Sequence, residues 1–432
     1  MRLSFALNMT THDTDTTVTT LPNGVRVLTL SLPQLDSACV SIFVQTGSRN
    51  EGRRLSGISH VAEHMAFKGT SQRNCQQINL DAERLGAEVN AHTDKDHTAY
   101  HMRGLAEHAP LFVRMLGEIV RDSSFPADEL ERERQVILQE LAEVEDDAFD
   151  TAFQLFDKAC WGDHPLAQPV IGRRKTIEAF QREQLQAYVT QQYTGANLVV
   201  AAAGRVAHEA IVREAQAALG SMPRGEPNRV AAPAFEGGVG LKRIAGHQQS
   251  HVVLGYPAPP VTEPSHVAHQ VAAAVLGEGM SSPLMDSLRE RLGLVYYAAC
   301  SADLDDLTGQ FVIEASMAPA NLPAFADEVQ RLLAAHAGAI DPMHLERARN
   351  QIAVRRLQTW ERPARRLEDA VLDLFAFGRV RSRQERQEAL QAVTASEVRE
   401  VFERLLAGPV AIGAAGKLPK AAADRLHALA EG

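Results

Sequence analysis

The chain has 432 residues, a length that favours two domains of about two hundred residues each over a single core. Hydrophobic residues make up 45% and charged residues 23%, which is typical of a folded globular protein and excludes a largely disordered one. The formal net charge of -10, with no stripe of arginine or lysine to offset it, argues against a nucleic-acid-binding protein.

The sequence lacks export, membrane and disulfide signals. The N-terminal segment "MRLSFALNMTTHDTD" has one basic residue and a short apolar patch that Asn8 interrupts, too little for a secretory signal. No apolar run approaches the ~18 residues that a membrane helix needs. The four cysteines lie far apart without a CxxC pair, which argues against a disulfide scaffold or a thiolate zinc site. We therefore expect a soluble cytoplasmic protein that binds neither nucleic acid nor membranes.

The first half of the chain begins with two stretches of strand-like alternation. "VRVLTLSL" (25–32) and "ACVSIFVQTG" (38–47) predict paired strands. A helix containing "SHVAEHMAFKGT" (59–70) follows, and then a strand at "AEVNAHTDKDHTAYHMRG" (87–104). Long helices come next, and "NLVVAAAG" (197–204) predicts a buried strand.

A segment rich in proline and glycine, residues 221–240, is predicted to link the two halves. Beyond it the succession repeats, with strands at "SHVVLGYPAP" and "GQFVIEASMAP", a helix at "SHVAHQVAAAVLG", and helices around "LERARNQIAVRRLQTW" and "RRLEDAVLDLFAFG". Two local matches in the same order indicate a duplication, since "SHVAEH" resembles "SHVAHQ" and "PADELERERQVILQEL" resembles "DPMHLERARNQIAVRRL". We predict an α+β fold of two homologous sandwiched α/β domains, residues 1–220 and 241–432, each an antiparallel-rich sheet with helices on one face.

The predicted helix near residue 60 concentrates polar side chains on one side. At about 100° per residue its apolar residues form one stripe, while His60, Glu63 and His64 fall within a roughly 100° arc opposite that stripe. Imidazoles four residues apart can bind one Zn²⁺ through bonds of about 2.0–2.1 Å. A solvated helix face that carries histidines by chance is the alternative, and the HxxEH spacing on a helix of this phase favours the metal.

These residue types suit hydrolysis of a carbonyl compound. Zinc lowers the pKa of a bound water toward ~7, and a carboxylate beside it can accept the proton during attack on a carbonyl. The same carboxylate can then give the proton to the leaving amine. Glu63 lies on the arc where it could take this role without being a ligand.

A third ligand has to come from elsewhere, because two histidines alone hold zinc poorly. The acidic helix "ELERERQVILQELAEVEDD" offers Glu133 and Glu140, which share a face with Ile137. Their Cα atoms lie about 10.5 Å apart along the helix axis, so only one of them can ligate directly. The spacing does not distinguish between them.

His92, His97 and His101 form a competing candidate. In one extended strand His97 and His101 would lie about 13 Å apart, too far to share a metal. We expect these histidines to be surface or core residues.

HxxEH followed by a glutamate one helix-rich segment later resembles the inverted zinc-binding motif of the pitrilysin family, which includes insulin-degrading enzyme and the mitochondrial processing peptidase. The resemblance runs along nearly the whole chain, through "LPNGVRVL", "GSRNE", "AFKGTSQRN", "GAEVNAHTDKDHTAYH" and "LGEGMSSPLMDSLRERLGLVYYAACS". The length and the two-domain form are similar to the smaller, processing-peptidase-like branch.

The resemblance implies a role for each residue of the motif. His60 and His64 would be zinc ligands, Glu140 the third ligand, Glu63 the general base, and Glu133 a supporting carboxylate behind a ligand.

The resemblance also implies a contribution from the second domain. Arg289 and Tyr296, in "LRERLGLVYY", would orient the substrate backbone and donate a hydrogen bond to the oxyanion. Without the resemblance, a helix-end arginine and a core tyrosine would be the simpler interpretation. Backbone groups around Asn90 and Ala91 would pair with an extended substrate peptide at an exposed sheet edge.

The second half does not repeat the metal motif. The matched positions carry His269 and Gln270 in place of the glutamate and second histidine, and Arg355 in place of the third ligand. We therefore expect one Zn²⁺ per chain. Because this chain carries both the zinc motif and the arginine–tyrosine pair, the resemblance implies a homodimer whose subunits enclose a chamber and complete each other's sites, with a related partner subunit as the alternative.

These observations predict a zinc metalloendopeptidase that hydrolyses short or unfolded peptides inside a closed chamber. Two alternatives stay open. One is a non-catalytic scaffold or partner subunit of the same fold, and the other is a peptidase dedicated to processing one precursor.

Overall fold

The computed structural model describes residues 9–13 and 15–431. Most of the segment tested for a secretory signal, residues 1–8, lies outside the described residues. The chain forms two compact units. The first contains the described residues up to Leu141 together with residues 168–230 and 359–382, and the second contains residues 142–167, 231–358 and the described residues from 383 onward.

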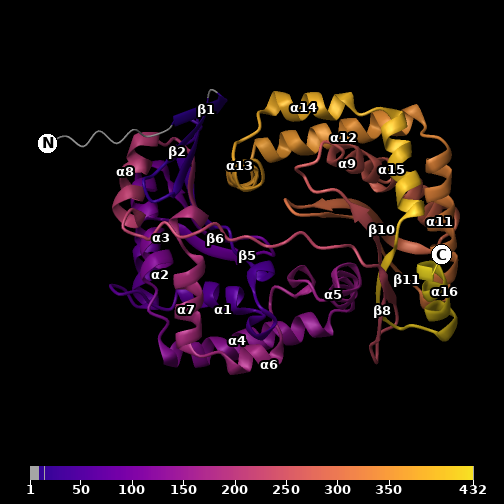
Figure 1. Ribbon diagram of the computed structural model, residues 1–432, viewed down its shortest axis with the longest axis horizontal. Coiled ribbons are helices and arrows are strands. Elements are labelled where there is room, and N and C mark those ends of the chain that lie inside the picture. Colours follow the sequence, from indigo (N-terminus) through magenta and orange to yellow (C-terminus); the bar gives the residue numbers. More distant parts are fainter. Residues whose placement is uncertain (1–8, 14, 432) are drawn as a thin grey trace. The chain divides into compact units, whose positions relative to one another are not determined.

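The first unit is built on a seven-stranded mixed sheet in the order β1-β2-β3-β7-β4-β6-β5. Figure 1 labels β1, β2, β5 and β6 of this sheet. Within the described strands β3 and β7 pair in parallel, and every other neighbouring pair is antiparallel. The strands are β1 (Met9–Asp13), β2 (Thr16–Thr20), β3 (Arg26–Ser31), β4 (Ser37–Val44), β5 (Glu88–Thr93), β6 (Thr98–Leu105) and β7 (Leu198–Gly204). Strand β5 therefore forms one edge of this sheet.

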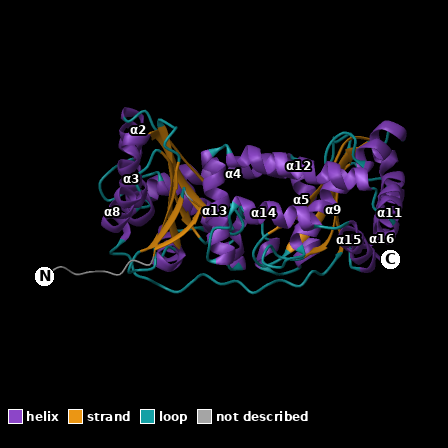
Figure 2. Cartoon of the chain, turned by 90° about the horizontal axis from the view of Figure 1, so that it is seen from above, coloured by secondary structure: helices purple, strands orange, loops and turns teal. Residues whose placement is uncertain are grey.

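Helices cover both faces of the first sheet (Figure 2). One face packs on α2, α3 and α8, and the other packs on α13, whose Leu367, Val371 and Leu374 are buried against it. The helices of this unit are α1 (Ile58–Ala66), α2 (Cys75–Arg84), α3 (Ala109–Asp122), α4 (Ala127–Asp146, which runs on past Leu141), α6 (Arg174–Ala179), α7 (Arg182–Gln192), α8 (His208–Leu219) and α13 (Pro363–Phe377).

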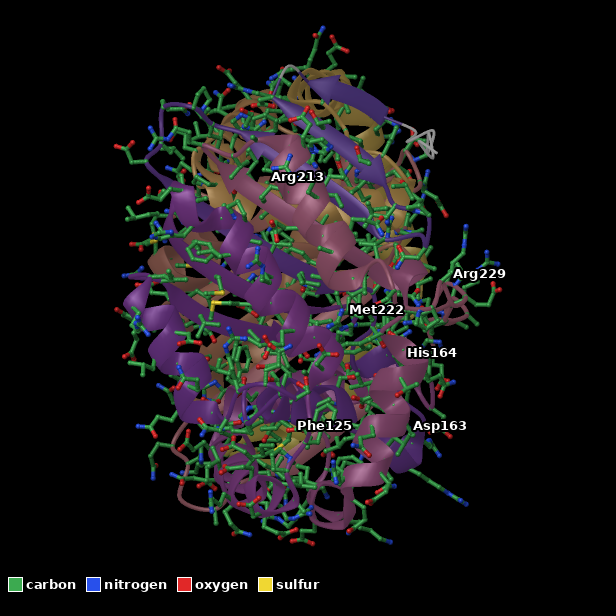
Figure 3. All side chains as sticks on the ribbon, turned by 90° about the vertical axis from the view of Figure 1, so that its left-hand side faces the viewer. Phe125, Asp163, His164, Arg213, Met222 and Arg229 are labelled. Atoms are coloured by element: carbon green, nitrogen blue, oxygen red, sulfur yellow. The ribbon has the colours of Figure 1, made fainter. Side chains whose placement is uncertain are left out.

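The turn between α3 and α4 contains the one described residue other than glycine with a positive φ. Phe125 has φ of 46°, and its ring is buried in a cluster with residues of α1 and α4. Figure 3 labels Phe125. Burial of a large aromatic ring offsets the cost of this backbone conformation. The turn thereby fixes where the acidic helix α4 begins.

The second unit repeats the plan with a five-stranded sheet in the order β10-β11-β9-β12-β8. Here β12 and β8 form the parallel pair, as β7 and β3 do in the first sheet. The strands are β8 (Gly238–Arg243), β9 (Ser250–Ala258), β10 (Val295–Leu304), β11 (Gly309–Met317) and β12 (Ala411–Gly416). The helices are α5 (Ala148–Trp161), α9 (His266–Gly277), α10 (Pro283–Met285), α11 (Leu322–Gly338), α12 (Pro342–Trp360, which runs on past Gln358), α14 (Arg383–Ala392), α15 (Ala395–Ala407) and α16 (Lys420–Glu431), with one π-helical turn at Asp286–Arg291. The matching strand order supports the predicted duplication.

Each half of the chain gives one helix to the other unit. Helix α5 comes before the predicted linker but packs on β8, β9 and β12, whereas α13 comes after it but packs on β4 and β7. Glycines let α5 approach closely, since a Cβ at Gly413 would lie 2.0 Å from Ala152 O and one at Gly255 would lie 2.3 Å from the Phe156 ring. The compact units therefore do not coincide with the two contiguous halves that a division at residues 221–240 would give. As a division of the sequence into two duplicated halves, it stays a prediction.

Three details differ from the predictions. The first two predicted strands are not neighbours, because β7 lies between β3 and β4. The stretch 87–104 is a hairpin of β5 and β6, because the polar residues 94–97 form its turn. Each sheet carries helices on both faces instead of one, because α5 and α13 cover the second faces. None of the helices in the described part of the chain is long and apolar enough to cross a membrane.

Candidate metal centre

Helix α1 begins where two glycines meet. Gly57 precedes the helix with φ of 93°, and a Cβ on it would lie 2.7 Å from Gly172 Cα. The buried carboxylate of Glu51 accepts hydrogen bonds from two backbone amides of this turn, Gly57 N at 2.7 Å and Ser59 N at 2.8 Å. The first amides of a helix have no partner within the helix, so Glu51 fixes the start of α1. Glu51 belongs to the "GSRNE" stretch, but this role could not be predicted from the sequence, because it depends on how that stretch packs against the start of α1.

The apolar stripe of α1 packs as its periodicity predicts. Ile58, Val61 and Met65 are buried in a cluster that also contains Leu130 and Ile137 of α4. The opposite side of α1 therefore faces the pocket described below, and α4 lies next to it. This packing brings the acidic residues of α4 to the histidines.

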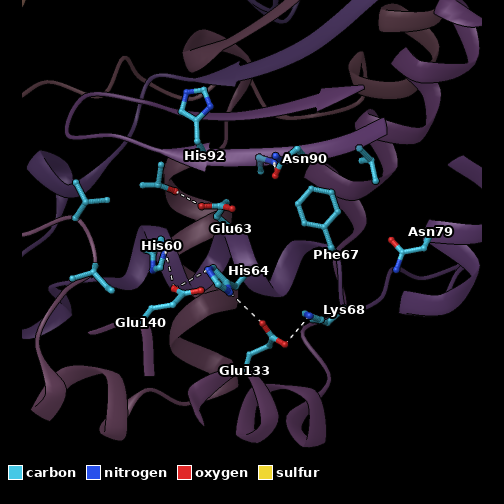
Figure 4. Close-up of a pocket in the computed structure, with 15 residues that line it drawn as sticks. His60, Glu63, His64, Phe67, Lys68, Asn79, Asn90, His92, Glu133 and Glu140 are labelled. Atoms are coloured by element: carbon cyan, nitrogen blue, oxygen red, sulfur yellow. Dashed lines mark hydrogen bonds and ion pairs between the residues drawn. The ribbon is translucent and has the colours of Figure 1, made fainter. Parts of the chain in front are cut away.

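Three metal-ligating groups meet between α1 and α4 (Figure 4). One ligand atom from each of His60, His64 and Glu140 lies within 4.8 Å of the others. Glu140 Oε2 is 3.9 Å from His60 Nε2 and 3.6 Å from His64 Nε2. Ligands on one tetrahedral ion with bonds of about 2.0–2.1 Å stand roughly 3.3–3.4 Å apart, so a small contraction would close these groups on Zn²⁺.

The protonation state of His60 suits a ligand. Burial, and then the neighbouring His64, lower the pKa of His60 to about 3. The imidazole is therefore neutral at physiological pH, the form that binds metals.

Glu133, one of the two acidic candidates on α4, lies behind His64. Its Oε2 is 3.1 Å from His64 Nδ1, and its Oε1 is 2.6 Å from Lys68 Nζ. A carboxylate at Nδ1 favours the tautomer that leaves Nε2 free for a metal. The contacts thus separate the two glutamates that the spacing left equivalent, with Glu140 beside both Nε2 atoms and Glu133 on the far side of one ring.

Glu63 points into the same pocket and is held by one hydrogen bond. Its Oε2 accepts from Thr93 Oγ1 of β5 at 3.0 Å. Burial raises the pKa of Glu63, and Glu140 adds to this, whereas His64 and the hydrogen bond from Thr93 oppose it. A raised pKa makes the carboxylate a stronger base than an exposed one. Sequence reasoning did not anticipate Thr93, because its contact with Glu63 depends on the packing of β5 over α1.

The pocket has a volume of about 590 Å³ and is bounded by α1, α4 and the edge strand β5. Asn90 and Ala91 of β5 line it, together with Val170 and Ile171. The backbone N–H of Ala91 donates to its neighbour's side chain, Asn90 Oδ1, at 2.8 Å. That N–H has therefore found a local acceptor at the edge of the sheet.

Arg289 and Tyr296 lie in the second unit, so their relation to the metal centre stays a prediction. Tyr296 is 82% exposed, and the Arg289 guanidinium lies 5.4 Å from the centroid of its ring. Arg289 belongs to the π-helical turn that precedes β10. Such turns are frequent at functional sites.

The positions that match the motif in the second unit serve packing. His266 Nδ1 and His269 Nδ1 each contact a backbone carbonyl within hydrogen-bonding distance, at 2.7 and 3.0 Å. Arg356 donates to Gln270, and Arg355 forms an ion pair with Glu278. Among the described residues of this unit no group of three or more histidines, cysteines or carboxylates lies close enough to hold a metal.

A helix carrying HxxEH beside a carboxylate from a second helix defines a candidate zinc centre of the inverted-motif peptidase class. Residues 26–174 match the family model described as insulinase, peptidase family M16, and residues 179–352 match the peptidase M16 inactive domain. The chain belongs to peptidase family M16. The match of residues 179–352 to a domain described as inactive agrees with the replacement of the motif at residues 266–270.

Relatives named as uncharacterized zinc proteases cover most of the chain. One from Rickettsia bellii is 32% identical over 396 residues, which make up 90% of this chain and 94% of the relative. One from Mycobacterium leprae is 36% identical over 74% of this chain and 73% of the relative. These names imply zinc as the metal of these two relatives.

Solved structures share the fold at low sequence identity. A protease from Helicobacter pylori aligns with a TM-score of 0.85 and 20% identity, covering 95% of this chain and all of that chain. A peptidase M16 inactive domain structure from Pseudomonas fluorescens aligns with a TM-score of 0.83 and 21% identity, covering 96% of this chain and 99% of that one. The α+β fold of two related sheet-and-helix domains predicted from the sequence is therefore confirmed.

Proposed function

We propose that this chain is a zinc-dependent endopeptidase that cleaves short or unfolded peptides. The observation that carries the proposal is one pocket lined by the His60–His64–Glu140 group, the Glu63 carboxylate and the free edge of β5. The group supplies two imidazole nitrogens and one carboxylate oxygen, a donor set that suits Zn²⁺ and leaves a fourth position open. When bound there, zinc would polarise the scissile carbonyl and make water a stronger nucleophile.

Glu63 moves the proton in this proposal. Its carboxylate, oriented by Thr93, accepts a proton from the attacking water and passes it to the nitrogen of the leaving amine. Glu133 and Lys68 hold the His64 ring in place and take no proton from the substrate.

The edge of β5 binds the substrate backbone. An extended peptide can pair with this edge as a further strand, with its backbone replacing the Asn90 side chain as the partner of Ala91 N–H. Recognition of backbone groups suits unfolded peptides of varied sequence, because a folded domain presents few free strands. Conversely, a requirement for one precursor would need side-chain pockets in addition to this edge.

Arg289 and Tyr296 complete the site in this proposal, with Tyr296 donating to the oxyanion and Arg289 orienting the peptide. We propose that the working form is a cytoplasmic homodimer in which a closed chamber surrounds the substrate and each subunit supplies this pair to the other. The presence of the zinc motif and the pair in one chain supports this assembly over one with a specialised partner.

Substitutions at Glu63 and His64 distinguish the proposed general base from a proposed zinc ligand. Glu63→Gln should keep zinc and lose peptidase turnover by about 10²–10⁴-fold, because the amide cannot accept the proton. His64→Ala should lose both zinc and turnover. Turnover is measured on a fluorogenic peptide and zinc by elemental analysis of the same samples, with Glu143→Gln, an exposed change on α4, as control.

Full turnover by Glu63→Gln would show that the base is another residue. A wild-type protein that holds zinc at His60 and His64 but cleaves no peptide would favour the non-catalytic alternative.

A further inference from the structure

A second group of metal-ligating side chains lies at the end of the β5–β6 hairpin. His92, Asp94, His97 and Glu368 each offer one ligand atom, and the four atoms lie within 4.8 Å of one another. His92 Nε2 is 3.2 Å from His97 Nε2, 3.9 Å from Asp94 Oδ2 and 3.7 Å from Glu368 Oε1. His97 Nε2 is 3.8 Å from the same Asp94 oxygen and 4.0 Å from the same Glu368 oxygen. The ligand atoms of a tetrahedral zinc ion lie roughly 3.3–3.4 Å apart, so the distances between these four atoms are already close to those that zinc requires.

This group is distinct from the HxxEH site. Successive side chains of a strand point to opposite faces of its sheet. Because Thr93 directs its hydroxyl to Glu63, the neighbouring His92 and Asp94 point to the other face, which α13 covers and where Glu368 lies. Figure 4 shows His92 on the side of β5 away from Glu63. The two groups share no ligand.

The hydrogen bonds at the two Nδ1 atoms favour the tautomers that a metal requires, and an ion would replace the hydrogen bond of 3.2 Å between the two Nε2 atoms. For both Nε2 atoms to bind an ion, both Nδ1 atoms must carry the proton and donate it. His97 Nδ1 is 2.8 Å from Asp96 Oδ1, and His92 Nδ1 is 2.9 Å from His101 Nε2. His101 in turn contacts Ser41 Oγ through its own Nδ1, at 2.8 Å. Every Nδ1 proton therefore has an acceptor, the arrangement that orients histidine ligands in metal sites.

The ligands are also held before any ion binds. His97 is 2% exposed, and the turn between the strands closes with Asp94 N donating to His97 O at 2.8 Å. The amides of Ser48 and Arg49 donate to the carbonyls of Asp94 and Lys95, so hydrogen bonds from a separate segment also hold the turn in place. Arg365 pairs with the second oxygen of Glu368 and leaves the first directed at the imidazoles. An ion would therefore bind side chains that are already held close to their ligating positions.

We propose that His92, Asp94, His97 and Glu368 bind a divalent transition-metal ion that joins the β5–β6 hairpin to α13. Two imidazole nitrogens and two carboxylate oxygens suit Zn²⁺ among the ions of this class. Because the protein fills all four positions, the site is structural, and it anchors the strand whose Thr93 contacts Glu63. The chain then holds a second ion in addition to the one expected at His60 and His64.

The experiment counts metal in the full chain after chelation and reloading with Zn²⁺ alone. Wild type should hold two ions per chain. The His60→Ala/His64→Ala variant should hold one, and so should an Asp94→Asn/Glu368→Gln variant, whose substitutions keep side-chain volume. Combining all four changes should leave none. Glu88→Gln, an exposed change on β5, serves as the matched control and should keep two.

A second readout does not depend on activity. In the His60→Ala/His64→Ala background, Zn²⁺ should raise the melting temperature, and adding Asp94→Asn and Glu368→Gln should abolish that rise. The proposal fails if the His60→Ala/His64→Ala variant, folded by circular dichroism, holds no zinc; the three histidines would then be a hydrogen-bonded chain only. The peptidase proposal is unaffected by that result, because this variant lacks the catalytic ligands from the start.

Discussion

Glu51 serves the candidate centre without lying in its pocket. Its two carboxylate oxygens accept from the backbone amides that begin α1, one turn before His60. Burial raises the pKa of Glu51 to about 8 although both amides favour the ionised form. The position of the helix that carries His60 and His64 is thereby linked to the protonation of a buried acid.

The stability of the chain should depend on pH through Glu51. An ordinary glutamate has a pKa near 4.5, so between pH 4.5 and 8 the folded chain binds more protons at Glu51 than the unfolded chain does. The contribution of Glu51 to the free energy of unfolding should therefore be fully present below pH 4.5 and fall as the pH rises through 8. Glu51→Gln cannot titrate. The difference in unfolding free energy between wild type and this variant, from urea titrations, should shrink across that window and level off above it.

Glu83→Gln, an exposed change on α2, should show no such trend. A difference between wild type and Glu51→Gln that stays constant from pH 4.5 to 8 would mean that Glu51 keeps its charge in the folded chain.

At the scale of elements, the β5–β6 hairpin connects the features of the first unit. It supplies the sheet edge that we propose binds substrate, the Thr93 hydroxyl that contacts Glu63, and two of the four side chains proposed to hold a second metal, His92 and His97. The turn between β5 and β6, residues 94–97, packs directly against the backbone of Gly47. A Cβ at Gly47 would lie 2.2 Å from Asp94 O and 2.8 Å from Lys95 C.

Gly47→Ala should therefore displace the turn. We expect a loss of about 1–3 kcal/mol in unfolding free energy, typical of a forced backbone shift, together with reduced peptidase turnover because Thr93 moves. Gly52→Ala is the matched control, since Gly52 has φ of -70° and a Cβ added there would have no other atom within 4 Å. Denaturant titration and a peptide assay on both variants check this. Equal behaviour of the two variants would show that the turn can shift without cost.

At the scale of the whole molecule, the exchange of helices ties the two halves of the sequence together. Helix α13 covers one face of the first sheet and α5 one face of the second. A contiguous half of the chain would leave buried residues such as Leu28 and Leu30 exposed on a bare sheet face. Each compact unit therefore contains residues from both halves of the sequence, and the division of the sequence into two duplicated halves stays a prediction.

In the proposed homodimer, Tyr296 of one subunit completes the active site that contains Glu63 of the other subunit. Mixing two inactive variants distinguishes this arrangement from one in which both residues come from the same chain. Glu63→Gln and Tyr296→Phe should each be inactive alone. If each subunit completes its partner's site, half of the randomly assorted dimers are mixed, and each mixed dimer has one intact site. A 1:1 mixture that has exchanged subunits should then recover about a quarter of wild-type turnover. A mixture that stays inactive after exchange, shown by size-exclusion chromatography of tagged subunits, would contradict completion by the partner.

Features that depend on local periodicity could be predicted without the fold. The 3.6-residue repeat of α1 was enough to put His60, Glu63 and His64 on one side and the apolar stripe on the other. The duplication and the fold class likewise followed from element order. These features were predictable because each is read from short stretches of sequence and from their order along the chain.

The tertiary structure alone decided every choice that depends on residues far apart in the chain. It separated Glu140 from Glu133, made one long strand into a hairpin, and brought Glu368 to His92 and His97 across the sheet. It also paired Glu51 with the start of α1. Contacts between side chains on different elements depend on how the elements pack, and the spacing of residues along the sequence does not predict that packing.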